Sequence, residues 1–346
     1  MLSYCSAMII RYRAYPRAGL IGNPSDGYFG KTIAFAFSNF NAEVVLYHTP
    51  ELEILPAGRD HSRFLSIRDL HRDVRRHGYY GGIRLLKATV KRFFDYCLEN
   101  HIQIDERNFT IRYNSNVPTQ VGLAGSSAII TACMRSLMAF YQVSIPKPTL
   151  ANLILSVENN ELGIPAGLQD RVCQVYEGLV YMDFDRDLMK RQGYGRYEEL
   201  DPTLLPPLYI AYRTELAEGT EVFHNNIRSR WEQGDSVVLE AMKTWAGLTE
   251  QVRELLCKGE KDKIGPLIDA GFDLRRSIYN ISRSNIAMVD AARSAGASAQ
   301  FTGSGGAIVG VYRDEAMYQE LEQRLTAVGV KLFKPTIVRS TGEMQP

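Results

Sequence analysis

A glycine- and serine-rich segment at residues 118–128, with the sequence PTQVGLAGSSA, has the composition of a phosphate-binding loop. Gly122 and Gly125 let the backbone approach a ligand closely. A strongly apolar helix is predicted to begin in this segment and to end near Tyr141. The free N–H groups and the dipole at its start favour an anion such as phosphate, and a serine hydroxyl there could bind Mg²⁺ that bridges phosphates. The alternative is a serine that only caps a core helix.

Two carboxylates flank a glycine-containing break further along the chain. Glu158 lies in a helix predicted at about 150–162, and Asp170 follows the break at 163–167. Enzymes that transfer phosphoryl groups use one carboxylate to hold Mg²⁺ and another to orient or deprotonate the attacking hydroxyl. Glu161 is an alternative to Glu158, and for any one of these acids a solvated helix face is the simpler interpretation.

Two more segments combine turn residues with a strand. Residues 17–26, RAGLIGNPSD, read as a strand that ends in polar turn residues, and residues 301–307, FTGSGGA, read as a glycine turn before an apolar strand at 307–311. By itself the second segment indicates only a tight turn with a bulge. Gly30-Lys31-Thr32 resembles the end of a P-loop, but Ser25 stands where that motif needs glycine.

The elements that must position these segments are of mixed type. The mixed order of helices and strands favours an α+β fold over a doubly wound parallel sheet. Three prolines at 201–207 mark the predicted boundary between domains at 1–200 and 201–346. Helical periodicity marks 82–100, 222–279, 285–295 and 315–328, and strand patterns mark 8–10, 33–37, 43–46, 109–113, 178–183 and 208–212.

The overall composition limits the classes of function. The 346 residues carry 40 Lys+Arg against 39 Asp+Glu, a net charge of +1, which disfavours binding of nucleic acid or of an anionic membrane surface. No stretch approaches the ~18 apolar residues that span a bilayer. The five cysteines are widely spaced without a C-x-x-C pair, and neither they nor the N-terminal segment indicates secretion. We expect a soluble, cytoplasmic protein.

Taken together and in their order, three of these segments resemble the motifs of the GHMP kinases, the family of galactokinase, homoserine kinase, mevalonate kinase and phosphomevalonate kinase. That family has an N-terminal G-R-V-N-L-I-G-E-H-T-D-Y segment, a phosphate loop P-x-x-x-G-L-G-S-S-A and a late G-x-G-G turn. Here they correspond to 17–28, 118–128 and 302–306. The phosphate loop has one extra residue, as in the heptose kinases of the family. The resemblance implies two domains, the N-terminal one like ribosomal protein S5 domain 2 and the C-terminal one ferredoxin-like.

Segments at 22–26, 78–82, 166–172, 178–184 and 272–276 are also similar to the sugar-acid kinases of the family. This resemblance implies a kinase that uses ATP and Mg²⁺ to phosphorylate D-glucuronate at its anomeric hydroxyl. A neutral hexose, a heptose phosphate or galacturonate is the nearest alternative substrate. A non-catalytic sugar-binding regulator on the same fold is a further alternative, although such proteins usually lose the aspartate or the metal ligands. A decarboxylase of the diphosphomevalonate type shares the fold, but the 166–172 segment argues against it.

The resemblance assigns roles residue by residue. Asp170 matches the catalytic aspartate that accepts the proton of the sugar hydroxyl or orients it. Arg17 matches the cation near that aspartate and the γ-phosphoryl group. Ser127 and Glu158 match the Mg²⁺ ligands. The segment implied to bind ATP contains Pro118, Gly122, Leu123, Ala124, Gly125, Ser126 and Ser127.

The sugar is expected to contact residues from several segments. Asp26 matches the acidic residue that holds sugar hydroxyls, while Asn23 replaces an acidic residue of the family pattern. The predicted substrate site contains Asn23, Asp26, Tyr28, Tyr80, Gln169, Arg171, Thr302, Gly303 and Ser304.

The carboxylate of a sugar acid needs a cation or a set of N–H donors. Arg171 is the first candidate because it is adjacent to Asp170, and Arg275 and Arg276 come next. The alternative role for Arg171 is a salt bridge that orients Asp170. Tyr79 or Tyr80 could add a hydroxyl to the site, or could pack in the core instead.

Overall fold

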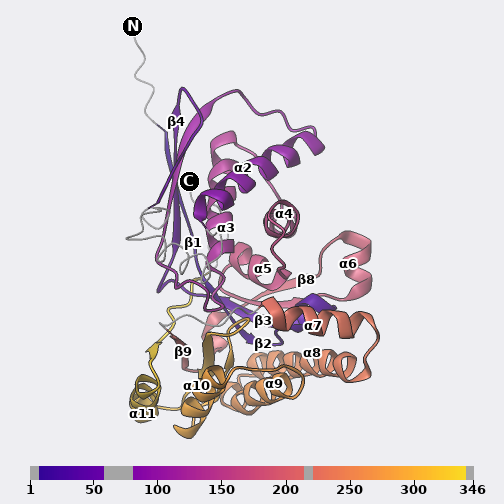
Figure 1. Cartoon of the computed structure of the whole chain (residues 1–346), viewed down its shortest axis with the longest axis vertical. Helices are drawn as coiled ribbons and strands as arrows, with labels where there is room; N and C mark the ends of the chain where they lie inside the picture. Colours follow the sequence, from indigo (N-terminus) through magenta and orange to yellow (C-terminus); the bar gives the residue numbers. More distant parts are fainter. Residues whose placement is uncertain (1–7, 58–80, 214–220, 340–346) are drawn as a thin grey trace, which may run out of the picture.

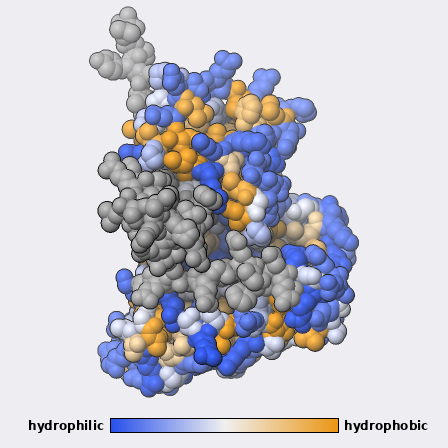
Figure 2. Space-filling model, viewed as in Figure 1, coloured by the Kyte–Doolittle hydropathy of each residue, from blue (hydrophilic) through white to orange (hydrophobic). Residues whose placement is uncertain are grey.

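The part of the chain that the structure describes folds into three four-stranded sheets with helices packed between and around them (Figure 1). A computed structural model describes residues 8–57, 81–213 and 221–339. The first half of the chain occupies the upper part of Figure 1 and the second half the lower part. Hydrophilic residues cover much of the face seen in Figure 2, and apolar residues gather between them in small groups.

The first sheet has the strand order β1-β4-β6-β5, and only the short β5 pairs in parallel. Helix α3 packs on this sheet and also contacts α2, α4 and α5, so it is buried on nearly every side. That position explains why its sequence is apolar almost all round. The elements are β1 (Ile9–Ala14), β4 (Ala42–Thr49), β5 (Glu53–Leu55), β6 (Asn108–Ser115), α2 (Gly82–Glu99), α3 (Gly125–Tyr141) and α4 (Lys147–Ser156).

The second sheet lies in the middle of the molecule and is antiparallel, with the order β2-β3-β7-β8 (Figure 1). Helix α5 packs above it and α8 below it, so β2 and β7 are buried along their whole length. Burial on both faces accounts for their continuous apolar runs. The elements are β2 (Arg17–Ile21), β3 (Lys31–Ala36), β7 (Leu179–Asp183), β8 (Arg196–Leu200), α5 (Leu168–Tyr176), α6 (Arg186–Gln192) and α8 (Ser236–Cys257).

The third sheet belongs to the C-terminal half and has the order β10-β11-β9-β12, all antiparallel. Helices α9 and α10 lie beside it in Figure 1. The elements are β9 (Leu208–Arg213), β10 (Gln300–Phe301), β11 (Ala307–Val311), β12 (Val330–Phe333), α7 (Glu221–Glu232), α9 (Gly265–Ile278), α10 (Arg283–Ser294) and α11 (Glu315–Ala327).

The predicted domain boundary at 201–207 falls between β8 and β9 and contains the short 3₁₀ turn Pro202–Leu204. One apolar cluster extends across it, because Phe35 and Leu179 from the N-terminal half pack with Ile210 and Val309 from the C-terminal half. The two halves therefore share a core. The division into domains at 1–200 and 201–346 stays a prediction.

Several elements differ from their predicted extents. The helical pattern at 222–279 forms three helices, because the chain turns at Gly234 and Gly259, both with positive φ. Helix α4 ends at Ser156 and continues as a π-helical turn, Val157–Glu161. The sequence did not predict β5, β8 and β12, each of which lies at a sheet edge. In the three described ranges, no helix is long and apolar enough to cross a membrane.

Candidate active site

Arg17, the first residue of β2, joins three motif segments at one point. Its Nε donates to Oδ1 of Asp170 over 2.7 Å, and its Nη1 donates to the carbonyl oxygens of Gly122 over 2.6 Å and Thr302 over 3.1 Å. The side chain is only 4% exposed. One buried guanidinium thus connects the phosphate loop, the start of α5 and the late glycine turn.

The phosphate loop and the late glycine turn are in direct backbone contact. A Cβ atom on Gly303 would lie 2.7 Å from the carbonyl oxygen of Gly122 and 2.8 Å from Nη2 of Arg17. A Cβ atom on Gly122, whose φ is +69°, would lie 2.8 Å from the carbonyl oxygen of Gly305. Both positions therefore need glycine for a steric reason, and Gly122 also needs it for its positive φ. Thr302 is fully buried, and its hydroxyl donates to the carbonyl oxygen of Gly122 over 3.1 Å.

The start of α3 has the features of an anion-binding helix N-terminus. Its N-cap residue is Ala124 in the left-handed conformation, and no side chain of the described residues caps it. A serine N-cap, the alternative left open by the sequence, is not what the structure has. Gly122 and Ala124–Ser126 are partly exposed, so a ligand can reach the loop. The N–H groups of the first turn and the helix dipole favour a phosphate there.

Asp170 lies in the first turn of α5 between two arginines. Arg17 approaches it from β2, and Nη1 of Arg171 lies 3.3 Å from its Oδ2. Burial raises the pKa of the Asp170 carboxyl, but the charges of Arg17 and Arg171 outweigh burial and hold the pKa below its usual value. The carboxylate is therefore ionised at neutral pH and fixed in orientation, as an acceptor for a substrate hydroxyl must be.

Arg171 is buried between two carboxylates. Its Nη2 donates to Oε2 of Glu158, and its Nη1 donates to the carbonyl oxygen of Gly167 over 2.9 Å and lies beside Asp170. Its side chain is 5% exposed. This geometry favours the positioning role that the sequence left open. Two internal carboxylates already balance its charge, which leaves little capacity for a substrate carboxylate.

Ser127 and Glu158 offer oxygen ligands of the kind that Mg²⁺ prefers. The described residues contain no group of three or more His, Cys, Asp or Glu that could hold a metal ion. Mg²⁺ in phosphoryl-transfer sites keeps several waters and is held by one or two carboxylates together with the substrate phosphates, so a sparse donor set fits this ion. Glu158 accepts from Arg171, and Ser127 Oγ donates to the carbonyl oxygen of Ala124 over 3.1 Å. Both side chains retain lone pairs for a cation.

Asp26 supplies a second carboxylate next to Asp170. It lies in the 3₁₀ turn Ser25–Tyr28, and its Oδ2 accepts from the backbone N–H of Gln169 over 3.3 Å. A Cβ atom on Gly167 would lie 2.3 Å from the same oxygen, so glycine is required there. Burial and the nearby charge of Asp170 raise the pKa of Asp26 to about 6. Two neighbouring carboxyls with pKa values shifted in opposite directions are typical of functional sites.

Asn23 and Arg275 tie α9 to this site. Nη2 of Arg275 donates to the backbone oxygen of Asn23 over 3.0 Å and also to its side-chain oxygen. Nη1 of Arg275 donates to the carbonyl oxygen of Gly303 over 2.8 Å. The predicted sugar contact Asn23 is thus already bonded to one of the candidate cations.

The remaining predicted substrate residues have different surroundings. Gln169 is fully buried against Gly19, and neither of its amide atoms has a hydrogen-bond partner in the described ranges. Tyr28 is half-buried and meets Trp231 edge to face at 5.6 Å, and Ser304 is partly buried in the glycine turn. Tyr79 and Tyr80 lie outside the described residues. Their substrate roles stay predictions.

Two residues near the site were missed by sequence reasoning. The guanidinium of Arg228, on α7, lies over the ring of Tyr28 at 4.8 Å, and that of Arg275 lies 5.6 Å from the ring of Tyr279. Neither Arg228 nor Tyr279 belongs to a recognisable motif. The apolar pattern of the sequence predicts the buried faces of α7 and α9, but it does not tell which neighbour a polar side chain contacts.

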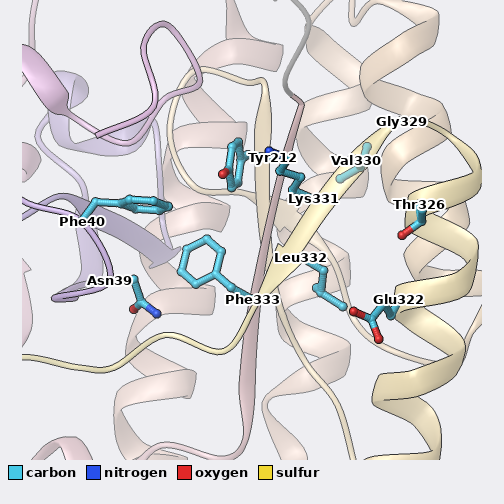
Figure 3. A pocket seen from close by; sticks show the side chains of 10 residues that line it. All are labelled: Asn39, Phe40, Tyr212, Glu322, Thr326, Gly329, Val330, Lys331, Leu332 and Phe333. Atoms are coloured by element: carbon cyan, nitrogen blue, oxygen red, sulfur yellow. The ribbon is translucent and has the colours of Figure 1, made fainter. Parts of the chain in front are cut away.

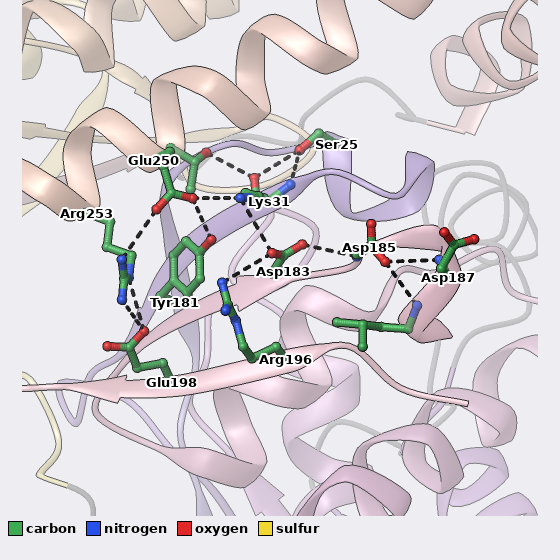
Figure 4. A network of polar contacts seen from close by, with 12 residues as sticks. Ser25, Lys31, Tyr181, Asp183, Asp185, Asp187, Arg196, Glu198, Glu250 and Arg253 are labelled. Atoms are coloured by element: carbon green, nitrogen blue, oxygen red, sulfur yellow. Dashed lines mark hydrogen bonds and ion pairs between the residues drawn. The ribbon is translucent and has the colours of Figure 1, made fainter. Parts of the chain in front are cut away.

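Lys31, whose Gly-Lys-Thr setting resembles the end of a P-loop, belongs to a network of ion pairs (Figure 4). Its Nζ donates to Oε2 of Glu250 on α8 over 2.7 Å and lies 3.5 Å from Oδ2 of Asp183. Arg253 continues the network, 3.4 Å from Glu250 and 2.7 Å from Glu198 on β8. Lys31 therefore links the second sheet to α8, which agrees with the exclusion of a P-loop.

A pocket elsewhere in the molecule contains none of the predicted site residues (Figure 3). It lies between the turn at Asn39 and Phe40, strand β12 and helix α11. The rings of Phe40, Tyr212 and Phe333 line one side and meet edge to face, with Phe40 and Phe333 5.4 Å apart. These rings pack β9 and β12 against the turn.

The fold and the site define a class of protein. Residues 84–178 match the family model described as GHMP kinases N terminal domain. The fold is similar to that of a galactokinase from Lactococcus lactis solved with galactose, with a TM-score of 0.77 over 95% of this chain and 93% of that chain at 15% identity. Two relatives from Arabidopsis thaliana, more than 40% identical, extend the likeness over most of the sequence. The chain belongs to the GHMP kinase family.

Both Arabidopsis relatives carry the name of the same enzyme. Glucuronokinase 1 of Arabidopsis thaliana is 43% identical over 306 residues, which cover 87% of this chain and 84% of the relative. Probable glucuronokinase 2 of the same plant is 45% identical over 308 residues, with the same coverage of both chains. The expected family resemblance and fold class are thereby confirmed.

Proposed function

We propose that this protein is an ATP-dependent sugar kinase that phosphorylates the anomeric hydroxyl of D-glucuronate and forms D-glucuronate 1-phosphate. The observation that carries the proposal is the buried pair of Arg17 and Asp170 at the contact between the phosphate loop and the glycine turn. It occurs in a chain that is 43–45% identical to glucuronokinases over 87% of its length.

In the proposed reaction, Asp170 orients the anomeric hydroxyl and accepts its proton as the sugar oxygen bonds to the γ-phosphorus. The bond between that phosphorus and the β–γ bridging oxygen breaks, and ADP leaves. Arg17 is a fixed cation close to Asp170, where it can balance charge that develops on the equatorial oxygens. Because Arg17 is already held by two carbonyl oxygens, it needs little reorganisation during the reaction.

The phosphates of ATP are proposed to bind the backbone of residues 122–127, at the uncapped start of α3. Mg²⁺ held by Ser127 and Glu158 would neutralise charge across the phosphates. Asp26, beside Asp170, is proposed to accept hydrogen bonds from sugar hydroxyls.

A reducing compartment such as the cytoplasm is proposed as the place of action. Cys97, Cys133, Cys173 and Cys257 are all free thiols, and burial raises the pKa of Cys133 and Cys173. Intracellular proteins usually keep their cysteines reduced. The near-zero net charge supports small molecules, rather than nucleic acid or a membrane, as partners.

The direct test is a coupled assay of ADP release with Mg-ATP and four sugars: D-glucuronate, D-galacturonate, D-glucose and D-galactose. We expect selective turnover of D-glucuronate and formation of the 1-phosphate, identified by phosphorus NMR. Turnover of a different sugar would keep the kinase and reject the substrate. If no sugar is phosphorylated while an ATP analogue still binds, the non-catalytic regulator becomes the better interpretation.

A further inference from the structure

Arg275 is a buried cation whose direct hydrogen-bond acceptors are all neutral. Its side chain is 5% exposed, and its three hydrogen-bond acceptors, the carbonyl oxygen of Gly303 and two oxygens of Asn23, are all neutral. Within the described ranges no carboxylate lies within 4.0 Å of it. Removing an unpaired charge from water is costly, and burial lowers the pKa of Arg275 accordingly. A buried arginine that donates only to neutral acceptors is suited to bind an anionic ligand.

A second arginine, Arg228, approaches the same turn, because its Nη2 lies 3.5 Å from the Cβ position of Gly27, next to Asp26. Arg228 is exposed, its guanidinium stacks on the ring of Tyr28, and it makes no hydrogen bond or ion pair to residues 8–57, 81–213 or 227–339. The guanidinium of Arg275 lies 5.6 Å from the ring of Tyr279. Burial raises the pKa of the Tyr279 hydroxyl, and the charges of Arg275 and Arg228 both act to lower it. We call Tyr28, Arg228, Arg275 and Tyr279 the arginine–tyrosine cluster.

The arginine–tyrosine cluster adjoins the reacting centre. Arg17 donates to the carbonyl oxygen of Thr302, and Arg275 donates to that of Gly303, the next residue of the same turn. Asp26 links the two groups, because it lies three residues from Asn23, which accepts from Arg275, and its carboxylate accepts from the N–H of Gln169, the residue before Asp170. A sugar that binds Asp26 and presents a hydroxyl to Asp170 would therefore lie near both arginines, and their positive charges would attract an anionic group on it.

We propose that Arg275 and Arg228 together bind the carboxylate of the sugar-acid substrate, an inference that rests on the proposed function. The carbons that carry the anomeric hydroxyl and the carboxylate both flank the ring oxygen of a hexuronic acid. A sugar that presents its hydroxyl to Asp170 thus carries its carboxylate close by. Arg171 is less suited to this role because Glu158 and Asp170 already balance its charge. A planar guanidinium is the best partner for a carboxylate because it can donate two parallel hydrogen bonds.

The test measures binding of D-glucuronate and of D-glucuronamide, its neutral analogue, by isothermal titration of the full chain with a non-hydrolysable ATP analogue. The parent protein should prefer the acid over the amide by about 10- to 100-fold, the size expected for a charge-assisted pair. Arg228→Gln and Arg275→Gln should each remove most of this preference while the affinity for the amide changes little. Arg275→Lys should restore part of it.

The control is Arg324→Gln, the same substitution at an exposed surface pair on α11, which should leave the preference unchanged. Because Arg228 is exposed, its variant keeps the test decisive even if Arg275→Gln fails to fold. The inference would be overturned if the Arg228→Gln variant lost affinity equally for the acid and the amide. It would also be overturned if the parent protein did not prefer the acid. Selective loss in a folded Arg171→Gln variant would assign the carboxylate to Arg171 instead. Binding of the acid without its phosphorylation would reject the proposed reaction and leave the carboxylate site standing.

Discussion

At the scale of single residues, the site is organised by how charges share a small buried volume. Asp170 has two arginines for one carboxylate, so its pKa falls although burial by itself raises it. At Asp26, burial and the charge of Asp170 outweigh the charge of Arg17 and the backbone hydrogen bonds, so the pKa rises to about 6. A carboxylate with a low pKa is a weak base. In the proposed reaction, Asp170 would therefore act mainly by orienting the hydroxyl, and would take up the proton only as the phosphoryl group is transferred.

Asp170→Asn tests this assignment. The variant keeps the shape of the side chain but removes the charge that pairs with Arg17. We expect kcat to fall by about 10²- to 10⁴-fold, the usual range for loss of acid–base catalysis, while the affinity for an ATP analogue stays close to that of the parent. Steady-state kinetics and a direct titration measure the two quantities. Parental turnover in this variant would show that another group receives the proton.

The raised pKa of Asp26 predicts a pH dependence. Above about 6 the carboxylate is ionised and can accept from sugar hydroxyls, and below about 6 it is protonated. The value of kcat/KM for D-glucuronate should therefore fall on the acid side with an apparent pKa near 6. In the Asp26→Asn variant, the remaining activity should not show this decrease at acid pH. The decrease near pH 6 cannot come from protonation of Asp170, because the pKa of that carboxyl is lowered.

Ionisation of Asp26 should lower the stability of the fold, although it favours activity. Its pKa in the fold is above the unfolded value of 3.8, so this group contributes stability at low pH that is lost as the pH rises from about 4 to about 6. Asp26→Asn should thus melt at the same temperature as the parent or higher at pH 7, although it loses activity. A variant that loses activity and stability together would indicate a structural role for Asp26.

At the scale of elements, the site depends on two glycine segments that touch through their backbones. The phosphate loop precedes α3, and the glycine turn joins β10 to β11, yet Gly122 and Gly303 are too close for any side chain. This contact fixes the carbonyl oxygens that hold Arg17. A side chain at either position would move the arginine and the phosphate loop together.

Gly303→Ala should reduce kcat/KM by about 10- to 100-fold, because shifts of about 1 Å at a reacting centre have effects of that size. The added methyl group would meet the Gly122 carbonyl oxygen at 2.7 Å and Arg17 at 2.8 Å. Gly247→Ala is the matched control, since Gly247 lies on the exposed side of α8 with nothing within 4 Å of its Cβ position. The control should keep full activity and gain about 0.5–1 kcal/mol of stability. Full activity of Gly303→Ala would mean that the loop and the turn can separate freely.

At the scale of the whole molecule, the two halves of the chain are joined by a shared core and by the polar network of Figure 4. The network runs from Lys31 on β3 through Glu250 and Arg253 on α8 to Glu198 on β8. Burial acts to raise the pKa of Glu250, but hydrogen bonds from Lys31 and Tyr181 lower it overall. The ion pairs therefore hold α8 on the central sheet, which carries Arg17.

Glu250→Gln should lower the free energy of unfolding by about 1 kcal/mol at pH 7, a modest value because the pair is partly exposed. A lowered pKa stabilises the fold above the unfolded value of 4.5, so the difference from the parent should shrink as the pH falls below that value. Urea titrations at several pH values measure it. Glu240→Gln, on the same helix with a 3.8 Å surface pair, should have almost no effect. A difference that persists at low pH would indicate that packing, and not charge, explains the loss.

The sequence by itself predicted an α+β fold from the mixed order of its elements, and it located the glycine segments because turns and helix starts are encoded by neighbouring residues. The residues expected to act at the site followed from the resemblance of these segments to the GHMP kinases. Long buried strands were also predictable, whereas β5, β8 and β12 were not, since short edge strands lack a continuous apolar run. Only the tertiary structure decided which charges pair. The sequence favoured Arg171 over Arg275 as the cation for a substrate carboxylate, but folding places Glu158 and Asp170 against Arg171 and only neutral hydrogen-bond acceptors against Arg275. The partners of a buried charge come from segments far apart in the chain, so no local pattern encodes them.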